Sequence, residues 1–268
     1  MKECGVQSSM FKKMLAFALT FCIAPFAFAP DAFAMLTAKA NHDHISVDFF
    51  YNGSAVSVKG ESEPGVDLVV KITAPEGRQK MRKKGKVAGF LWMNVGDIVF
   101  DHTPNLYFLH STRSVDDILT PAEQDAHLIG YRSLEKHIAV EPAFSPEEKE
   151  RWFDEFVKFR ESSNLYALSN GKIETTLTDK GRQKYALYLD WPYQASPGGY
   201  TVTVFAVKNG KVVETAYSHV KVEQTGVVKA LAGMAVAHGG LYGLVSVLVA
   251  LGAGFGVGMV FGKGGGAH

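Results

Sequence analysis

The sequence has little cysteine: Cys4 and Cys22 are the two in 268 residues. Both precede residue 35, the expected start of the mature chain, so we expect the mature protein to have no disulfide, thiolate metal site or cysteine nucleophile. The sequence also has no Gly-x-Ser-x-Gly motif, which presents the nucleophilic serine of many hydrolases. A hydrolase whose non-standard site is assembled from separate residues remains the second alternative function, and we expect no enzyme.

Neither sign of charge dominates, since 28 Lys and Arg against 27 Asp and Glu give a net charge of +1. Nucleic-acid-binding proteins normally carry a clear basic surplus, so we expect no nucleic-acid partner. We assign no catalytic residues and no cofactor.

The N-terminus has the pattern of a secretory signal peptide. Lys2, Lys12 and Lys13 precede an apolar run over residues 14–28, and Ala32-Phe33-Ala34 supplies small residues where a signal peptidase cleaves. Residues 1–34 are therefore expected to be removed. An uncleaved anchor is the alternative, but the apolar run is short for a membrane span.

A second apolar run, Leu241 to Phe261, contains no charged residue and would extend about 31 Å as a helix. This length matches the hydrocarbon core of a bilayer, so we predict a transmembrane helix; a buried core helix is the alternative. The predicted topology is a single-pass protein of a bacterial inner membrane, with its domain in the periplasm and residues 262–268 in the cytoplasm. Lys263 agrees with this orientation.

Glycines recur at a spacing of four in the second half of this span. Gly252, Gly254, Gly256 and Gly258 would let another helix approach closely, so we predict that they contact a partner helix. The alternative is that small residues are simply common in such helices.

Between the two apolar ends, residues 35–225 contain short segments in which apolar and polar residues alternate, as they do in β-strands. Turn signals such as Asn52-Gly53 and Asn209-Gly210 separate them. We predict a mainly β domain, an immunoglobulin-like antiparallel β-sandwich. The expected strands are Ile45–Phe50, Ala55–Lys59, Val66–Thr73, Val87–Trp92, Ile98–Phe100, Leu106–Leu109, Ile173–Leu177, Tyr185–Trp191, Tyr200–Val207 and Val212–Val222.

The period changes to helical in an insertion over about residues 116–163. Thr120-Pro121 with Glu123, and Ser145-Pro146 with Glu148, each combine an N-cap, a first-turn proline and a capping-box glutamate. Two helices are predicted, Pro121–Ala139 and Pro146–Ser162. Residues 226–240 form a short juxtamembrane segment that keeps the domain close to the bilayer.

The densest charge feature is a basic run with six cations in nine residues. As a functional element it would meet anionic lipid headgroups or an acidic partner. The alternative is a solvated loop between two strands. We include all six as candidate partner-binding residues: Arg78, Lys80, Arg82, Lys83, Lys84 and Lys86.

Histidines suggest a weak candidate metal site. His42 and His44 flank Asp43 but point to opposite faces of an extended chain, so Asp101, His102 or His110 would have to complete the ligand set. A polar terminus without metal is the favoured interpretation. Trp92 is expected in the sandwich core.

Several segments together resemble a family of uncharacterised bacterial transmembrane proteins first described from alphaproteobacteria. They are Tyr51-Asn52-Gly53, Asp67–Val70 with Pro75, Arg82–Asn94 and Pro104–Ser111. The capped helix, closing hairpin and terminal span also fit. The resemblance carries no assigned activity. It implies a place beside sulfite-exporter permeases of the TauE/SafE type.

The leading functional prediction is therefore a non-enzymatic accessory subunit of such a permease. It would contact the multi-span partner through the glycines of the span and the basic run. The alternative is a tethered periplasmic module that binds a small solute or a metal.

Overall fold

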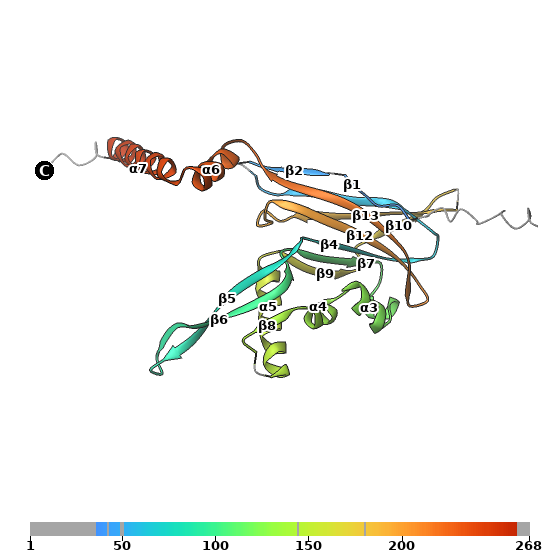
Figure 1. Cartoon of the computed structure of the whole chain (residues 1–268). Helices are drawn as coiled ribbons and strands as arrows, with labels where there is room; N and C mark the ends of the chain where they lie inside the picture. The colour runs from blue at the N-terminus through green and yellow to red at the C-terminus, as the bar shows by residue number, and fades with distance from the viewer. Residues whose placement is uncertain (1–35, 42, 49–50, 144, 180, 262–268) are drawn as a thin grey trace, which may run out of the picture. The chain divides into compact units, whose positions relative to one another are not determined.

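The computed structural model describes residues 36–41, 43–48, 51–143, 145–179 and 181–261. The predicted signal peptide, the tail after residue 261 and His42 lie outside this range. Within it the chain is mainly β, with three sheets, a group of helices inserted between strands and an apolar C-terminal helix (Figure 1).

A four-stranded and a six-stranded sheet enclose the first core. The four-stranded sheet has the order β1 (Lys39–Ala40), β3 (Ser54–Ser62), β11 (Gln183–Trp191), β10 (Glu174–Leu177). The six-stranded sheet has the order β2 (His44–Val47), β13 (Lys211–Gln224), β12 (Gly198–Lys208), β4 (Asp67–Thr73), β7 (Tyr107–Ser111), β9 (Tyr166–Asn170).

The six-stranded sheet is a middle layer because its central strands bury both faces. Along β4, Leu68, Val70 and Ile72 face the four-stranded sheet and join the first hydrophobic core. Val69, between them, faces the other way into a second core that the inserted helices cover. The alternation of a strand thus assigns neighbouring residues of one short segment to different cores.

The inserted helices are α2 (Val115–Ile118), α3 (Pro121–His127), α4 (Tyr131–His137) and α5 (Pro146–Ser162). The prediction for α5 is confirmed, and Ser145 caps it by accepting a hydrogen bond from the amide of Glu148. The single helix predicted over Pro121–Ala139 is wrong. Leu128 and Gly130 have positive φ values of 49° and 90°, which end one helix and start the next in another direction.

The solvated loop considered as the alternative for the basic run is not what the structure shows. Residues Glu76–Val87 form strand β5, which pairs with β6 (Leu91–Pro104) to make a long hairpin. The short strand β8 (Ala139–Glu141) completes this three-stranded sheet. The strand predicted over Val87–Trp92 contains the hairpin turn instead, since Ala88 and Gly89 adopt positive φ.

The closing hairpin of β12 and β13 around Asn209-Gly210 is confirmed. Most strand pairs are antiparallel, as predicted, whereas the edge pairs β2 with β13 and β7 with β9 are parallel. The specifically immunoglobulin-like topology stays a prediction.

Two apolar helices follow the β domain. Helix α6 (Gly226–Ala237) occupies the predicted juxtamembrane segment, and helix α7 (Gly239–Phe261) covers the predicted span. Residues Gly239–Met259 are long and apolar enough to cross a membrane, and none of the best window is buried against the rest of the chain. Among the described helices, α7 is the one that is both long enough and apolar enough to cross a membrane.

Candidate functional site: a cleft between the two sheets

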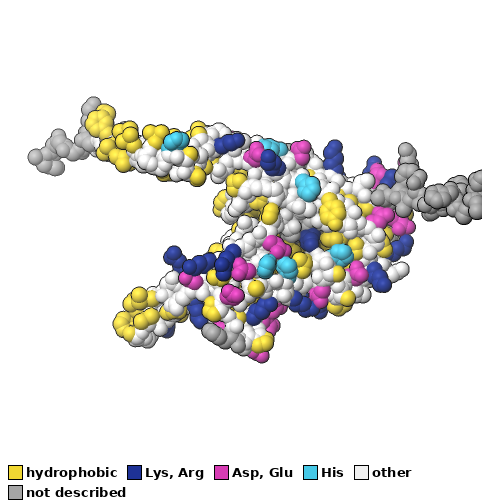
Figure 2. Space-filling model, viewed as in Figure 1, with side chains coloured by type: hydrophobic (Ala, Val, Ile, Leu, Met, Phe, Trp, Pro, Cys, Tyr) yellow, Lys and Arg dark blue, Asp and Glu magenta, His cyan; other side chains and the backbone are white. Residues whose placement is uncertain are grey.

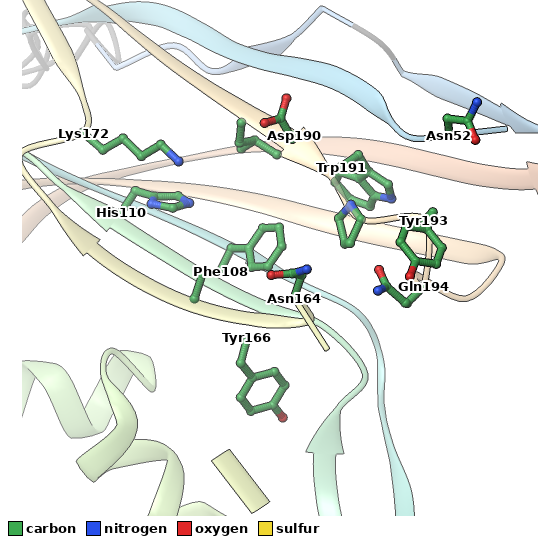
Figure 3. Close-up of a pocket in the computed structure, with 13 residues that line it drawn as sticks. Asn52, Phe108, His110, Asn164, Tyr166, Lys172, Asp190, Trp191, Tyr193 and Gln194 are labelled. Atoms are coloured by element: carbon green, nitrogen blue, oxygen red, sulfur yellow. The ribbon is translucent and has the colours of Figure 1, made fainter. Parts of the chain in front are cut away.

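A cleft of about 400 Å³ opens where the edges of the four-stranded and six-stranded sheets meet (Figure 3). Strands β7 and β9 supply one wall, and the end of β11 with the loop after it supplies the other. Its lining consists of Asn52, Phe108, His110, Asn164, Tyr166, Ala167, Lys172, Leu189, Asp190, Trp191, Pro192, Tyr193 and Gln194.

His110 is a buried ionisable group of the cleft. Along β7, Tyr107 and Leu109 face the helices, so Phe108 and His110 face the four-stranded sheet. The His110 side chain is 2% exposed, and its Nδ1 has no hydrogen-bond partner in the described structure. Burial lowers the pKa of His110 to about 4, and the positive charge of Lys172 adds to this effect. The imidazole is therefore neutral at neutral pH.

Two further buried polar atoms line the same cleft without a hydrogen-bond partner among the described residues. They are Nε1 of Trp191, which is 1% exposed, and Oε1 of Gln194. The indole of Trp191 is held edge-on against Tyr200, with ring centroids 4.8 Å apart. Leaving a polar group buried and unpaired costs about 1–3 kcal/mol each, so three such atoms among the lining residues are unusual.

Lys172 supplies a cation at one end of the cleft. It follows the turn residue Gly171, which adopts a φ of 72° between β9 and β10. Figure 3 shows its ammonium end beside the ring of His110. The carboxylate of Asp190 belongs to the exposed face of β11 and points away from Trp191. At this end of the cleft the Lys172 ammonium and the His110 imidazole can both donate hydrogen bonds, which suits a small anion.

Among the described residues, the lining contains one histidine, and its hydroxyl groups belong to Tyr166 and Tyr193; no serine, threonine or cysteine side chain lines it.

The histidines proposed as metal ligands lie apart from one another. His44 is 3.8 Å from Glu223. His102 and His137 both lie beside Glu76, at 3.5 and 2.8 Å. These are ion-pair arrangements, and the described residues hold no group of three or more candidate ligands. His110, considered as an additional ligand, faces the cleft instead.

The six cations of the basic run lie along β5 and have different surroundings. Arg78 pairs with Asp101 at 3.1 Å and Lys80 with Asp97 at 2.8 Å. Lys86 lies over the ring of Trp92, 5.4 Å from its centroid. The expectation that Trp92 belongs to the core is wrong, because it is 63% exposed near the hairpin turn. Arg82, Lys83 and Lys84 follow the same strand toward that turn.

The four glycines of the span all lie in α7. A methyl group added at any of them would meet no atom within 4 Å outside the local helix. At about 100° per residue, Gly252 and Gly256 share one face, and Gly254 and Gly258 share nearly the opposite face. The span therefore offers two small-residue surfaces.

The β domain and its terminal helix define a membrane protein with one candidate span near the C-terminus. Residues 35–263 match the family described as Putative transmembrane protein (Alph_Pro_TM), and the chain belongs to that family. Comparisons with curated proteins and with solved structures give no match.

Proposed function

We propose that the protein is a non-enzymatic, membrane-anchored binding module whose β domain holds a small anion in the cleft at His110. The supporting observation is a buried imidazole beside a cation at one end of the cleft: among the described residues Nδ1 of His110 has no hydrogen-bond partner, and Figure 3 shows the ammonium end of Lys172 beside its ring. In this proposal α7 holds the domain at the periplasmic face of the inner membrane.

The chemistry of the lining selects the ligand class. Lys172, which Figure 3 shows beside His110, donates with a full positive charge. Neutral His110 can donate from one ring nitrogen. An oxyanion such as a sulfite, sulfate or short-chain carboxylate would accept from these groups, and the volume of about 400 Å³ is ample for it.

Replacing Lys172 by methionine keeps much of the side-chain length and removes the charge. We expect the variant to bind the anion at least about tenfold more weakly, because one charge-assisted hydrogen bond is worth roughly 1.5–3 kcal/mol. The measurement is calorimetric titration of the full chain in lipid nanodiscs with sulfite, sulfate and acetate in turn. The matched control is Lys184→Met, which removes the same charge from an exposed position on β11.

Equal anion affinities for wild type, Lys172→Met and Lys184→Met would show that the Lys172 charge does not contribute to anion binding. Failure of the wild-type protein to bind any of the three anions at about 10 mM would remove the proposal.

A second candidate function is an accessory subunit of a multi-span permease of the sulfite-exporter type. The open space around the glycines of α7 favours it, since two small-residue faces allow close helix–helix packing. A bound anion would then be delivered to, or received from, the permease.

For this candidate we expect a permease to co-purify with the full chain from native membranes in mild detergent. Gly254→Leu with Gly258→Leu should reduce its recovery about tenfold or more, because leucine holds the helices apart. Gly252→Leu with Gly256→Leu tests the opposite face at equal added volume. If both double variants retain every membrane partner, the glycine faces do not form the contact.

A further inference from the structure

The tip of the β5–β6 hairpin is a concentrated exposed apolar surface. We call residues 83–95 the hairpin arm. Phe90 is 79% exposed and Trp92 63%, with Val87, Leu91, Met93 and Val95 also exposed. Figure 2 shows this apolar end beyond a dark blue group of cations. A soluble protein normally covers such a surface, because it promotes aggregation.

The arm stands free of the other elements near its end. Strand β8 pairs with β6 only at residues 99–101, and Lys83 lies over the ring of Trp152 in α5. Beyond that point the pairs Lys84 with Asn94, Lys86 with Trp92 and Val87 with Leu91 extend the ribbon to its turn. The six residue-to-residue steps from Lys83 to Gly89 span about 20 Å.

Between Gly77 and Gly96 the charges of this hairpin are all of one sign. No Asp or Glu occurs from Gly77 to Gly96. The two cations near its base are neutralised by Asp101 and Asp97, whereas no carboxylate of the described residues lies within ion-pair distance of Arg82, Lys83, Lys84 or Lys86. The apolar turn is therefore bordered by uncompensated positive charge.

An aromatic tip bordered by lysines is the arrangement by which protein segments enter the headgroup region of a membrane. Phe and Trp favour the interface, and each nearby cation gains roughly 1 kcal/mol from anionic lipid. The β domain is also tethered close to a bilayer, because the candidate span begins at Gly239, shortly after β13 ends at Gln224.

The ribbon itself limits the depth of insertion. Both outer edges of a two-stranded hairpin carry unpaired backbone N–H and C=O groups, which cannot enter hydrocarbon without a large cost. Only the turn and its side chains would pass the headgroups.

We propose that the hairpin arm inserts Phe90, Leu91 and Trp92 into the interface of the bilayer that α7 spans, with Lys84 and Lys86 on anionic headgroups. The arm would then be a second attachment that fixes the orientation of the β domain on the membrane. This inference goes beyond the binding function and does not depend on what the cleft holds.

The test uses the full chain with Cys4→Ser and Cys22→Ser, labelled with an environment-sensitive fluorophore at Phe90→Cys. The protein is placed in nanodiscs of phosphatidylcholine with phosphatidylglycerol, with and without brominated acyl chains. We expect bromine to quench the label at 90 at least about threefold more than a label at Leu177→Cys. Leu177 is a matched control, since it is an apolar side chain of β10 with 68% exposure.

Lys84→Glu with Lys86→Glu should abolish most of this quenching, and phosphatidylcholine alone should give less than the anionic mixture. Equal quenching of the labels at positions 90 and 177 in these nanodiscs, which contain no other membrane protein from the cell, overturns the proposal. If the label at 90 becomes protected only in native membranes, the arm binds a protein instead, which also overturns it.

Discussion

Two aspartates in the centre of α7, at Leu248 and Leu251, should release the protein from the membrane. Both side chains are exposed in a helix without any charge. Each aspartate adds about 3 kcal/mol to the free energy of insertion, so we expect the pair, at about 6 kcal/mol, to prevent stable insertion. The measurement is the fraction of protein that stays in the membrane pellet after alkaline carbonate extraction.

The control places the same charges outside the candidate span. Val227 and Val236 are exposed positions of α6, so Val227→Asp with Val236→Asp should leave the protein in the pellet. Retention of the Leu248→Asp, Leu251→Asp protein in the pellet would show that α7 is not the anchor.

His110→Phe should make the protein more resistant to acid. An unfolded histidine binds a proton below a pKa of about 6.5. Folded His110 does so only below about 4. Between these values the unfolded state binds more protons, so the wild-type free energy of unfolding falls as the pH falls. The loss from this group is about 3 kcal/mol at pH 4.

We therefore expect the stability of His110→Phe relative to wild type to rise by about 3 kcal/mol between pH 7 and pH 4, measured by denaturant unfolding in detergent. Phenylalanine keeps a planar aromatic ring next to Phe108 and removes the titratable group. His219→Phe, at an exposed position of β13, is the control and should track the wild type. If the difference in unfolding free energy between His110→Phe and wild type stays constant across this pH range, His110 has the same pKa in the folded and unfolded states, which would contradict the prediction.

Local sequence signals correctly predicted the helices and hairpins that are determined by a few neighbouring residues. The helix Pro146–Ser162 follows from the serine cap and proline start, and the β12–β13 hairpin follows from Asn209-Gly210. The break between α3 and α4 was missed because Leu128 enters a left-handed conformation that its side chain does not favour. The β5–β6 hairpin was missed because its cations suggested a loop, whereas cross-strand pairing sets its structure.

The cleft could not be predicted from local sequence patterns, because its lining residues come together only when the two sheets pack against each other. His110 comes from β7, Lys172 from the turn after β9, and Trp191 from the end of β11. One signal was available: His110 lies in the apolar strand Tyr107–Ser111, in which every residue is buried. A histidine in such a strand needs a polar partner.

The most direct test of the proposed binding site is the pKa of the His110 imidazole, measured by NMR on histidine-labelled full chain with and without sulfate. The His110→Phe variant identifies its signal. An anion in the cleft stabilises the protonated ring, so we predict a pKa of about 4 in the free protein and a rise of at least about one unit with saturating anion. An unchanged pKa in the presence of the anion would contradict the account, because no anion would then lie beside His110.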